Sequence, residues 1–415
     1  MTDHASHSLT TILRALVPFA GAYVLSYTLR TVNAVVAPDL VADFALSAGE
    51  LGLLTSAYLL SFALFQLPLG VLLDRYGARR VQSLLILVAA SGIFLFAAAP
   101  DFLTLVIARA LIGLGFSAGL MASLKSSSDW VAPQRRAFVN SLFLAAGGLG
   151  VVVATKPTAL MAQAWGWRGA FMVLGALCIA VAAVIFTVVP ARPGEGRAAA
   201  PLGEQVAQLV AILKLPLFWR IAPLTGLSTG VSMAIITLWS GPWLRDVLGL
   251  TRQAVANHLF LMALAFVAGN VLVGVVADRL QRRGFGIMAI MLGVLSLYMA
   301  GLLVLTLQVK ALALPALMLM AGTGQSGFLA FPWFAARVGP GLAGRSNATI
   351  NFIMFMVAFA AQALIGVIIG RFPPTATGYA AEGYGLAYGL FLGAQIIALL
   401  WYLAAPKRLT EDSQS

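Results

Sequence analysis

The sequence predicts an all-α membrane protein with twelve transmembrane helices in two related six-helix halves. Three observations predict it: the composition, the number of long apolar runs, and one motif that occurs twice. The 415 residues are 61% hydrophobic and only 10% charged, with a mean hydropathy of +0.95, whereas soluble domains carry about a quarter charged residues. A chain this apolar has too little polar surface to cover itself in water, so lipid is its expected solvent.

Runs of mostly apolar residues mark the expected spans, because about 20 helical residues cross the hydrocarbon core of a bilayer. The runs cover about 13–37, 51–73, 81–99, 102–125, 137–160, 169–189, 220–243, 255–276, 286–306, 311–334, 348–370 and 386–404. A stretch rich in Pro, Gly and charge, PARPGEGRAAAPLGEQ, interrupts the pattern after the sixth run. We therefore expect an N-terminal bundle over 1–189, a cytoplasmic linker over 190–219 and a C-terminal bundle over 220–415.

The basic residues set the expected orientation. With both ends inside, 17 of the 26 Lys and Arg fall in cytoplasmic stretches and five fall outside, as the positive-inside rule predicts for an even number of spans. We therefore expect a multi-pass protein of the cell inner (plasma) membrane with both termini in the cytoplasm. Basic loops that face an anionic leaflet explain the net charge of +12 without nucleic acid as a partner.

Two copies of a short motif lie at equivalent places in the two halves. GVLLDRYGARR (70–80) follows the second run and GVVADRLQRRG (274–284) follows the eighth, with Gly, Asp and two Arg aligned at one offset. An internal duplication explains this match. The glycines that begin the copies allow close helix approach. The aspartates have arginines nearby, so an ion-paired latch can hold one conformation; the alternative is that these arginines only set the topology.

The first copy resembles the loop motif of the major facilitator superfamily. RALIGLGFSAG (109–119) resembles the fourth-helix Arg-Gly motif of that family, and GWRGAF (166–171) resembles the turn into its sixth helix. The resemblance covers about residues 10–405 and implies the major facilitator fold, with two pseudo-symmetric six-helix bundles around a central cavity that work by alternating access. The residues to which it gives gating or structural roles are Gly70, Asp74, Arg75, Gly77, Arg79, Arg80, Arg109, Gly113, Gly274, Asp278 and Arg279.

Four basic residues lie inside the expected spans: Arg30, Arg109, Lys125 and Lys156. The 14 acidic residues all fall in loops or near helix ends, so the sequence places no carboxylate deep in any span. A charge at the centre of a bilayer costs about 3 kcal/mol or more. Either backbone carbonyls and water compensate the positive charge, or an anion does. We interpret this pattern as the mark of an anionic substrate.

Arg30 belongs to a polar face of the first span, because Tyr23, Ser26, Tyr27, Arg30 and Asn33 recur at helical spacing. Its guanidinium is always charged and can hold a carboxylate through two parallel hydrogen bonds. The Arg-x-x-Asn pattern resembles the organic anion branch of the superfamily, the anion:cation symporters of the hexuronate and phthalate type. Those relatives often carry an acid just before this arginine and another in the fourth helix. This chain has Leu29 and IGLGFSAGLMASL there, which argues against a carboxylate proton relay.

The other intramembrane residues each have two interpretations. Arg109 either bonds backbone carbonyls or takes part in coupling, and each lysine either extends to its own interface or draws an anion toward Arg30. GTGQSGFLAFPWF (322–334) is either a broken helix that lines a site or an ordinary close helix contact. The predicted substrate-binding residues are Arg30, Tyr23, Tyr27, Asn33, Lys125, Lys156, Gln325, Ser326, Asn351 and Trp333.

These features predict a secondary active transporter that moves a small organic anion, a carboxylate, by proton symport or anion exchange. The chain has no GxxxxGK[ST] loop, HExxH or CxxC spacing, so we expect no enzyme activity, no cofactor and no metal. The expected partners are an anionic small molecule, protons as the candidate coupling ion and the lipid bilayer, and we expect a monomer. The alternative is multidrug or metabolite efflux by proton antiport, although exporters of cations generally need buried acids. Inorganic nitrate transport is disfavoured because the second span lacks an arginine.

Overall fold

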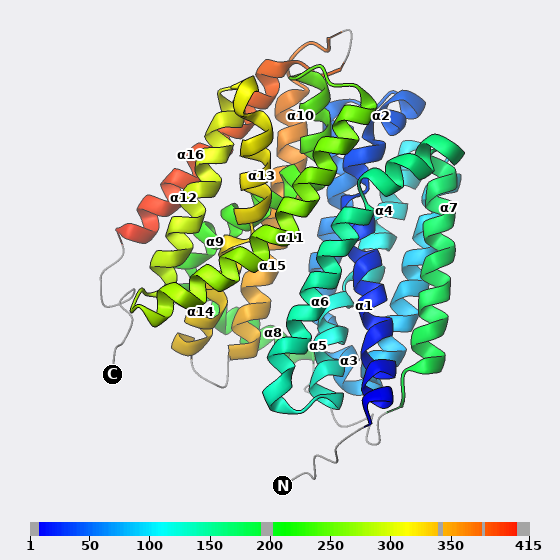
Figure 1. The fold of residues 1–415 in the computed structure, drawn as a ribbon, viewed down its shortest axis with the longest axis vertical. Helices are drawn as coiled ribbons and strands as arrows, with labels where there is room; N and C mark the ends of the chain where they lie inside the picture. The colour runs from blue at the N-terminus through cyan, green and yellow to red at the C-terminus, as the bar shows by residue number, and fades with distance from the viewer. Residues whose placement is uncertain (1–7, 192–201, 339–342, 376–377, 405–415) are drawn as a thin grey trace. The chain divides into compact units, whose positions relative to one another are not determined.

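The computed structural model describes residues 8–191, 202–338, 343–375 and 378–404 (Figure 1). Within these ranges the chain is helical and forms no β-strand; an isolated bridge joins Thr375 and Gly378. The two termini, which we predict to be cytoplasmic, and residues 192–201 of the predicted linker lie outside the described residues. The fold class is therefore the all-α membrane fold that the sequence predicts.

The chain divides into two compact units. The first unit contains residues 1–36 and 57–204, and the second contains 37–56 and 205–415. The segment 37–56, which joins the first two spans, thus packs with the second half of the chain. The predicted boundaries do not anticipate this assignment, because they follow the order of the sequence.

The helices of the first unit follow one another closely. They are α1 (Leu9–Thr31), the start of α2 (Asn33–Phe44), most of α3 (Ala48–Ala98), α4 (Phe102–Phe116), α5 (Gly119–Trp130), α6 (Pro133–Val153) and α7 (Lys156–Val188). The next helix, α8 (Leu202–Leu213), lies in the stretch that we predict to be a linker. Figure 1 shows α1, α6 and α7 as long neighbouring rods in blue and green.

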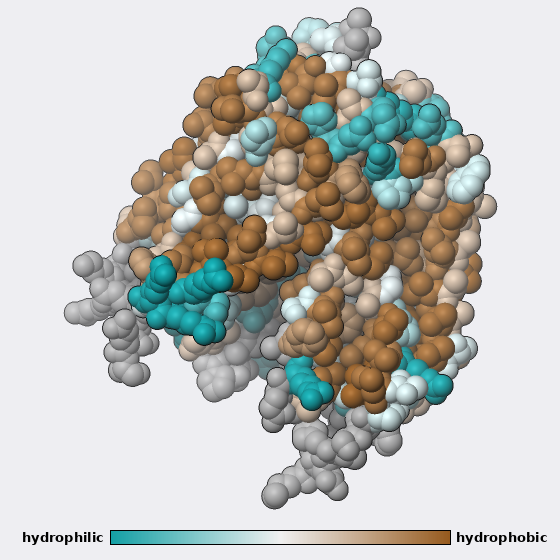
Figure 2. Space-filling model, in the orientation of Figure 1, coloured by the Kyte–Doolittle hydropathy of each residue, from teal (hydrophilic) through white to brown (hydrophobic). Residues whose placement is uncertain are grey.

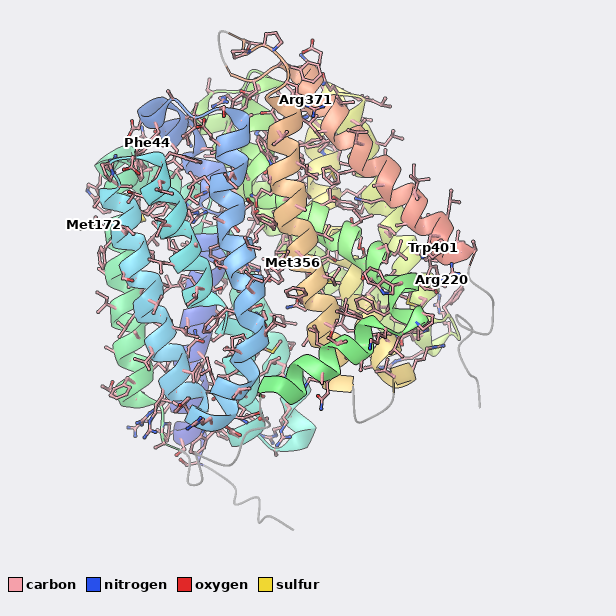
Figure 3. All side chains as sticks on the ribbon, turned by 180° about the vertical axis from the view of Figure 1, so that it is seen from behind. Phe44, Met172, Arg220, Met356, Arg371 and Trp401 are labelled. Atoms are coloured by element: carbon pink, nitrogen blue, oxygen red, sulfur yellow. The ribbon has the colours of Figure 1, made fainter. Side chains whose placement is uncertain are left out.

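The second unit holds the remaining helices. They are α9 (Pro216–Ala234), the π-helical turn η1 (Ile235–Trp239), α10 (Ser240–Asp246), α11 (Arg252–Arg282), α12 (Ile287–Thr306), the 3-10 turn η2 (Lys310–Leu312), α13 (Ala313–Thr323), the 3-10 turn η3 (Ser326–Leu329), α14 (Ala330–Val338), α15 (Ala343–Ile369) and α16 (Ala381–Leu403). At one end of this unit Arg220 of α9 lies 4.0 Å over the ring of Trp401 of α16, and Arg371 lies at the other end (Figure 3).

Twelve spans account for these helices apart from α8. Ten helical segments of the described chain are long and apolar enough to cross a membrane. One of them, α3, has 51 residues and contains two spans joined at Gly77, where φ is 78°. Another span combines α6 with the first turns of α7. Helix α7 then bends at Gly166 (φ 70°), and the residues after the bend form the next span. Figure 2 agrees with a lipid environment, because the face that it shows is mainly apolar and hydrophilic residues gather near helix ends.

The first and fourth spans of each half are interrupted in their middle. The helix is broken at Val32, between α1 and α2, and at Ser117 and Ala118, between α4 and α5. In the second half η1 and η3 provide the interruptions. The break in 322–334 is thus confirmed, and the other three had no comparable signal in the sequence.

Close helix contacts in the first unit depend on glycines. A Cβ atom added at Gly113 of α4 would lie 2.2 Å from the carbonyl oxygen of Tyr58, and one added at Gly150 of α6 would lie 2.2 Å from that of Val24. Gly274 behaves differently: no atom of the described chain lies within 4 Å of its added Cβ. The prediction that Gly274 allows close helix approach is therefore wrong, because its face of α11 meets no neighbouring helix.

We expect Gly113→Ala to lower the free energy of unfolding by about 1–3 kcal/mol, because the added methyl must displace backbone of α3 in a packed contact. Gly274→Ala is the matched control. Its methyl enters open space and its higher helix propensity leaves stability unchanged or slightly raised. Thermal unfolding in detergent checks both. Equal losses for the two variants would contradict this account of the packing.

Candidate functional site

The polar face of α1 lies inside the first unit. Tyr23, Arg30 and Asn33 are all buried, and Arg30 is only 7% exposed. The ring of Tyr23 meets that of Tyr27 edge to face, with centroids 5.1 Å apart. The structure thus brings together Tyr23, Tyr27 and Arg30, three of the residues that the sequence predicts for the site.

Aromatic rings surround the guanidinium of Arg30. Its Cζ lies 4.6 Å from the ring centroid of Tyr27, 4.9 Å from that of Phe62 and 5.9 Å from that of Tyr58. Ring faces attract a cation, and the attraction grows where water is excluded. A guanidinium directs its hydrogen-bond donors outward in its own plane, so rings near its central carbon are compatible with an anion held at its edge.

Glycines of α6 make room for the two tyrosine rings. A Cβ atom added at Gly147 would lie 2.8 Å from Tyr23 and 2.9 Å from Tyr27. Thr28, one turn before the end of α1, donates a hydrogen bond of 3.0 Å to the carbonyl of Gly150. The sequence AAGGLG in α6 is therefore the surface on which the polar face of α1 packs.

Arg109 is the second buried arginine of this unit, with no exposed surface. Its Nη1 donates a hydrogen bond of 3.0 Å to the carbonyl oxygen of Leu29, and its Cζ lies 5.7 Å from the ring of Tyr58 and 5.5 Å from that of Phe96. Its Nε and Nη2 donate no hydrogen bond within the described part of the chain. This hydrogen bond to Leu29 agrees with the first of the two interpretations of Arg109, in which the arginine bonds a backbone carbonyl.

Two functional candidates were missed by the reasoning from sequence. Tyr58 and Phe62 lie one helical turn apart on α3, with stacked rings 6.0 Å apart. Only the tertiary structure brings this span to Arg30. The available signal was weak, because aromatic residues one turn apart are common on helices that pack in any core.

Lys125 does not join the group around Arg30. Its Nζ forms an ion pair of 2.7 Å with Oδ1 of Asp74, the acid of the first motif copy. The sequence drew attention to the arginines near Asp74, whereas the structure shows that α5 brings a lysine to its carboxylate. The loop motif and the fourth span are joined at this end of the first unit.

The other motif residues have separate surroundings. Arg79 donates to the carbonyl of Val189 at 3.2 Å, which ties α3 to the end of α7. In the second copy, Asp278 pairs with Arg282 at 2.9 Å along the same helix, and both side chains are mostly exposed. An i,i+4 pair of this kind lies within one helix, so it does not join α11 to another helix. Arg75, Arg80 and Arg279 are also exposed, and Gly70 is half-buried.

Lys156 is exposed and begins α7, immediately after the interruption that follows α6. Its position at a helix start is consistent with either interpretation of this lysine.

In the second unit the predicted residues lie at the broken span. Ser326 begins η3 and is buried, and its hydroxyl has no hydrogen-bond partner among the described residues. Helix α9 packs against this segment at two glycines. A Cβ atom added at Gly324 would lie 1.8 Å from Oγ of Ser232, and one added at Gly327 would lie 2.5 Å from Oγ1 of Thr229. The segment is therefore both a broken helix and a close helix contact.

The remaining predicted residues of this unit differ in their environment. Gln325 and Asn351 are half-buried. Trp333 is buried, and the Cζ of Arg337 lies 3.9 Å over its ring. One face of this indole is therefore already covered by an arginine of the same helix, which leaves less of it for a substrate than the sequence suggests.

The family profile of the Major Facilitator Superfamily matches residues 19–364. The chain belongs to the Major Facilitator Superfamily. Among solved structures, a bacterial homologue of the human lysosomal transporter Spinster has a TM-score of 0.73 to this chain at 18% identity, covering 96% of each chain. This likeness shows the major facilitator fold.

Two curated relatives of this superfamily member are named as transporters. A probable sulfoacetate transporter of Cupriavidus necator is 25% identical over 279 residues, which cover 63% of this chain and 64% of the relative. A hexuronate transporter of Bacillus subtilis is 27% identical over 241 residues, or 56% of each protein. The chain thus matches less than two thirds of the length of either relative, and neither relative is an enzyme.

We expect the Asp74–Lys125 pair to show a measurable coupling. Both partners are partly exposed, so a double-mutant cycle of Asp74→Asn and Lys125→Gln should give about 0.2–1 kcal/mol in the free energy of unfolding. The Asp278→Asn and Arg282→Gln cycle is the control, with a smaller coupling because that pair is more exposed. Coupling of zero at Asp74–Lys125 would contradict the assigned ion pair.

Proposed function

We propose that this protein is a secondary active transporter that carries a small organic anion, a carboxylate, across the inner membrane by alternating access. The observation that carries the proposal is the environment of Arg30, a permanently charged group buried in the first unit beneath three aromatic rings. A buried charge in a membrane segment is costly and is a mark of substrate paths.

The chemistry of the group favours an oxyanion. Carboxylate and sulfonate oxygens match the fork of a guanidinium and form charge-assisted hydrogen bonds with it. The rings stabilise the cation in the absence of substrate, so the site does not depend on the anion to remain folded. Tyr27, at 4.6 Å, also has a phenolic hydroxyl that can donate to the same anion.

The two relatives support this substrate class. Sulfoacetate and hexuronates are both small organic anions that carry a carboxylate. Proton symport and anion exchange are both open to this chain, and Leu29 beside Arg30 provides no acidic group for a relay. Efflux of an uncharged or cationic compound by proton antiport is the competing function that the experiment below must exclude.

The rest of the proposal concerns the whole transporter. We assign the anionic group to Arg30, Tyr23, Tyr27 and Asn33, and the uncharged part of the substrate to Gln325, Ser326, Asn351 and Trp333. Lys156 is retained as an attracting charge, whereas Lys125 is assigned to the ion pair with Asp74. The first motif copy gates the cytoplasmic side. The protein acts as a monomer with an N-terminal bundle, a linker and a C-terminal bundle, and both termini in the cytoplasm.

We expect Arg30→Ala to lower anion uptake by about 30-fold or more, because loss of a buried charge partner typically costs 2–5 kcal/mol. Arg30→Lys should retain part of the uptake, since it keeps the charge and loses the fork. The measurement is uptake of a panel of radiolabelled carboxylates and sulfonates into proteoliposomes, with and without a pH gradient. Stimulation by an inward proton gradient indicates symport, and stimulation by internal anion indicates exchange.

Arg371→Ala is the matched control, since this arginine is exposed near the end of α15 (Figure 3) and lies far along the chain from the ring cluster. It should leave uptake unchanged. Full uptake of every transported anion by a correctly folded Arg30→Ala protein would falsify the Arg30-centred site. Transport of lipophilic cations in place of anions would support efflux.

A further inference from the structure

Two exposed tryptophans and an arginine lie together at one end of the second unit. Trp219 and Arg220 belong to the first turns of α9, and Trp401 belongs to the last turn of α16, beside Arg220 (Figure 3). One apolar span begins with α9 and another ends with α16, so these side chains lie at the boundary between lipid and water. Trp219 is 51% exposed and Trp401 is 48% exposed. The proposed transport site uses none of the three.

Hydrogen bonds fix the three side chains to the backbone. Nε1 of Trp219 donates to the carbonyl of Leu213, where α8 ends, at 2.7 Å, and Nε1 of Trp401 donates to the carbonyl of Trp219 at 2.9 Å. Nη1 of Arg220 donates to the carbonyl of Trp401 at 3.2 Å. The ends of α8, α9 and α16 are thereby joined. Because the single donor of each indole is used inside the protein, the ring surface that remains exposed is carbon.

The charge of Arg220 has no acidic partner in the described part of the chain. Its Cζ lies 4.0 Å from the ring centroid of Trp401, and among the described residues its guanidinium forms one hydrogen bond and no ion pair. The sequence explains this, because it has no Asp or Glu within 205–245 or 383–404. A guanidinium carries five N–H donors, so most of them remain available. The ring holds the cation in place without neutralising it.

Lys214 adds a second positive charge to this surface. It is exposed and lies between α8 and α9. Since the carbonyl of Leu213 accepts from Trp219, the next residue, Lys214, is held beside the same cluster. The surface therefore combines two basic groups with two exposed aromatic rings.

We propose that Lys214, Trp219, Arg220 and Trp401 form a binding site for the headgroup of an anionic phospholipid, which we call the headgroup site. Phosphate oxygens match the fork of a guanidinium and form charge-assisted hydrogen bonds with it. The second charge, on Lys214, favours a lipid of net negative charge over a zwitterionic one. The indoles pack against the glycerol and the upper acyl chains, where tryptophan is enriched in membrane proteins.

The apolar part of the surface favours a lipid over a free phosphate ion. Inorganic phosphate can accept hydrogen bonds from Arg220, but it covers none of the exposed carbon of Trp219 and Trp401. A phospholipid does both, because its acyl chains begin next to its phosphate. On the predicted cytoplasmic side, basic groups also meet the anionic lipids of the leaflet.

A lipid in the headgroup site would also hold α8. This helix lies in the stretch between the two six-span halves, and its last carbonyl accepts from Trp219. A bound lipid therefore attaches the end of that stretch to the leaflet. The headgroup site shares no residue with the proposed transport site and needs no transported substrate.

Lipid binding to the purified full chain measures the site directly. The detergent-solubilised protein is titrated with dioleoyl phosphatidylglycerol, and in parallel with dioleoyl phosphatidylcholine, and bound lipids are counted by native mass spectrometry. We expect the first phosphatidylglycerol to bind at least about fivefold more tightly than phosphatidylcholine. Each basic residue near an anionic lipid contributes about fivefold. Arg220→Gln and Lys214→Gln should therefore each weaken phosphatidylglycerol binding by about that factor, and the double variant by about 25-fold.

Three controls keep the result specific. Arg371→Gln removes an exposed arginine at the other end of the second unit (Figure 3) and should leave phosphatidylglycerol binding unchanged. Arg220→Lys keeps the charge and loses the fork, so it should retain part of the affinity. Inorganic phosphate at millimolar concentration should not displace the lipid. Thermal unfolding shows whether each variant is folded, and Lys214→Gln, at an exposed position, carries the test if Arg220→Gln misfolds.

Equal affinity for the two lipids would overturn the headgroup site, as would phosphatidylglycerol binding that neither Arg220→Gln nor Lys214→Gln weakens. Displacement of the lipid by inorganic phosphate would also overturn it, because the surface would then be a site for a free anion. Selective phosphatidylglycerol binding that the folded variants weaken supports it. The titration involves no transport, so failure of anion uptake would refute the proposed function and leave the lipid result standing.

Discussion

A guanidinium that cannot lose its charge lies inside an apolar helix bundle, and much of the first unit is arranged around it. Arg30 is buried beneath Tyr27, Tyr58 and Phe62. Glycines permit two of the helix contacts in this region: Gly147 leaves room for the tyrosine rings of α1, and Gly113 brings α4 against the backbone of Tyr58. The packed rings also compensate part of the charge, because ring faces attract a cation.

The second buried arginine extends this arrangement. Arg109 holds the carbonyl just before Arg30 and shares the ring of Tyr58 with it. Two cations therefore lie on one aromatic side chain in a region of low dielectric, where like charges repel more strongly than in water. A unit with this charge distribution is better suited to an anion than to a cation, which is why we favour uptake or exchange of anions over efflux of cationic drugs.

The ion pairs between helices show a different use of charge. Lys125 with Asp74 and Arg252 with Asp39 lie near opposite predicted membrane faces, and their side chains are partly exposed. Such pairs add little stability because water competes for both partners. This weakness is compatible with the gating role that we propose for the first motif copy, and the rings around Arg30 are compatible with the binding role that we propose for that residue.

The sequence alone determined the solvent, the number of spans, the duplication and the polar face of the first span, because hydropathy and helical period are local properties of the chain. It also indicated the broken span at 322–334 from its Gly and Pro. It did not indicate the interruptions at Val32, Ser117 and η1, where no comparable signal exists. Tertiary structure decided the partners: Tyr58 and Phe62 for Arg30, Lys125 for Asp74, and the second unit for residues 37–56. These contacts join residues far apart in the chain, and which side chains meet depends on how whole helices pack.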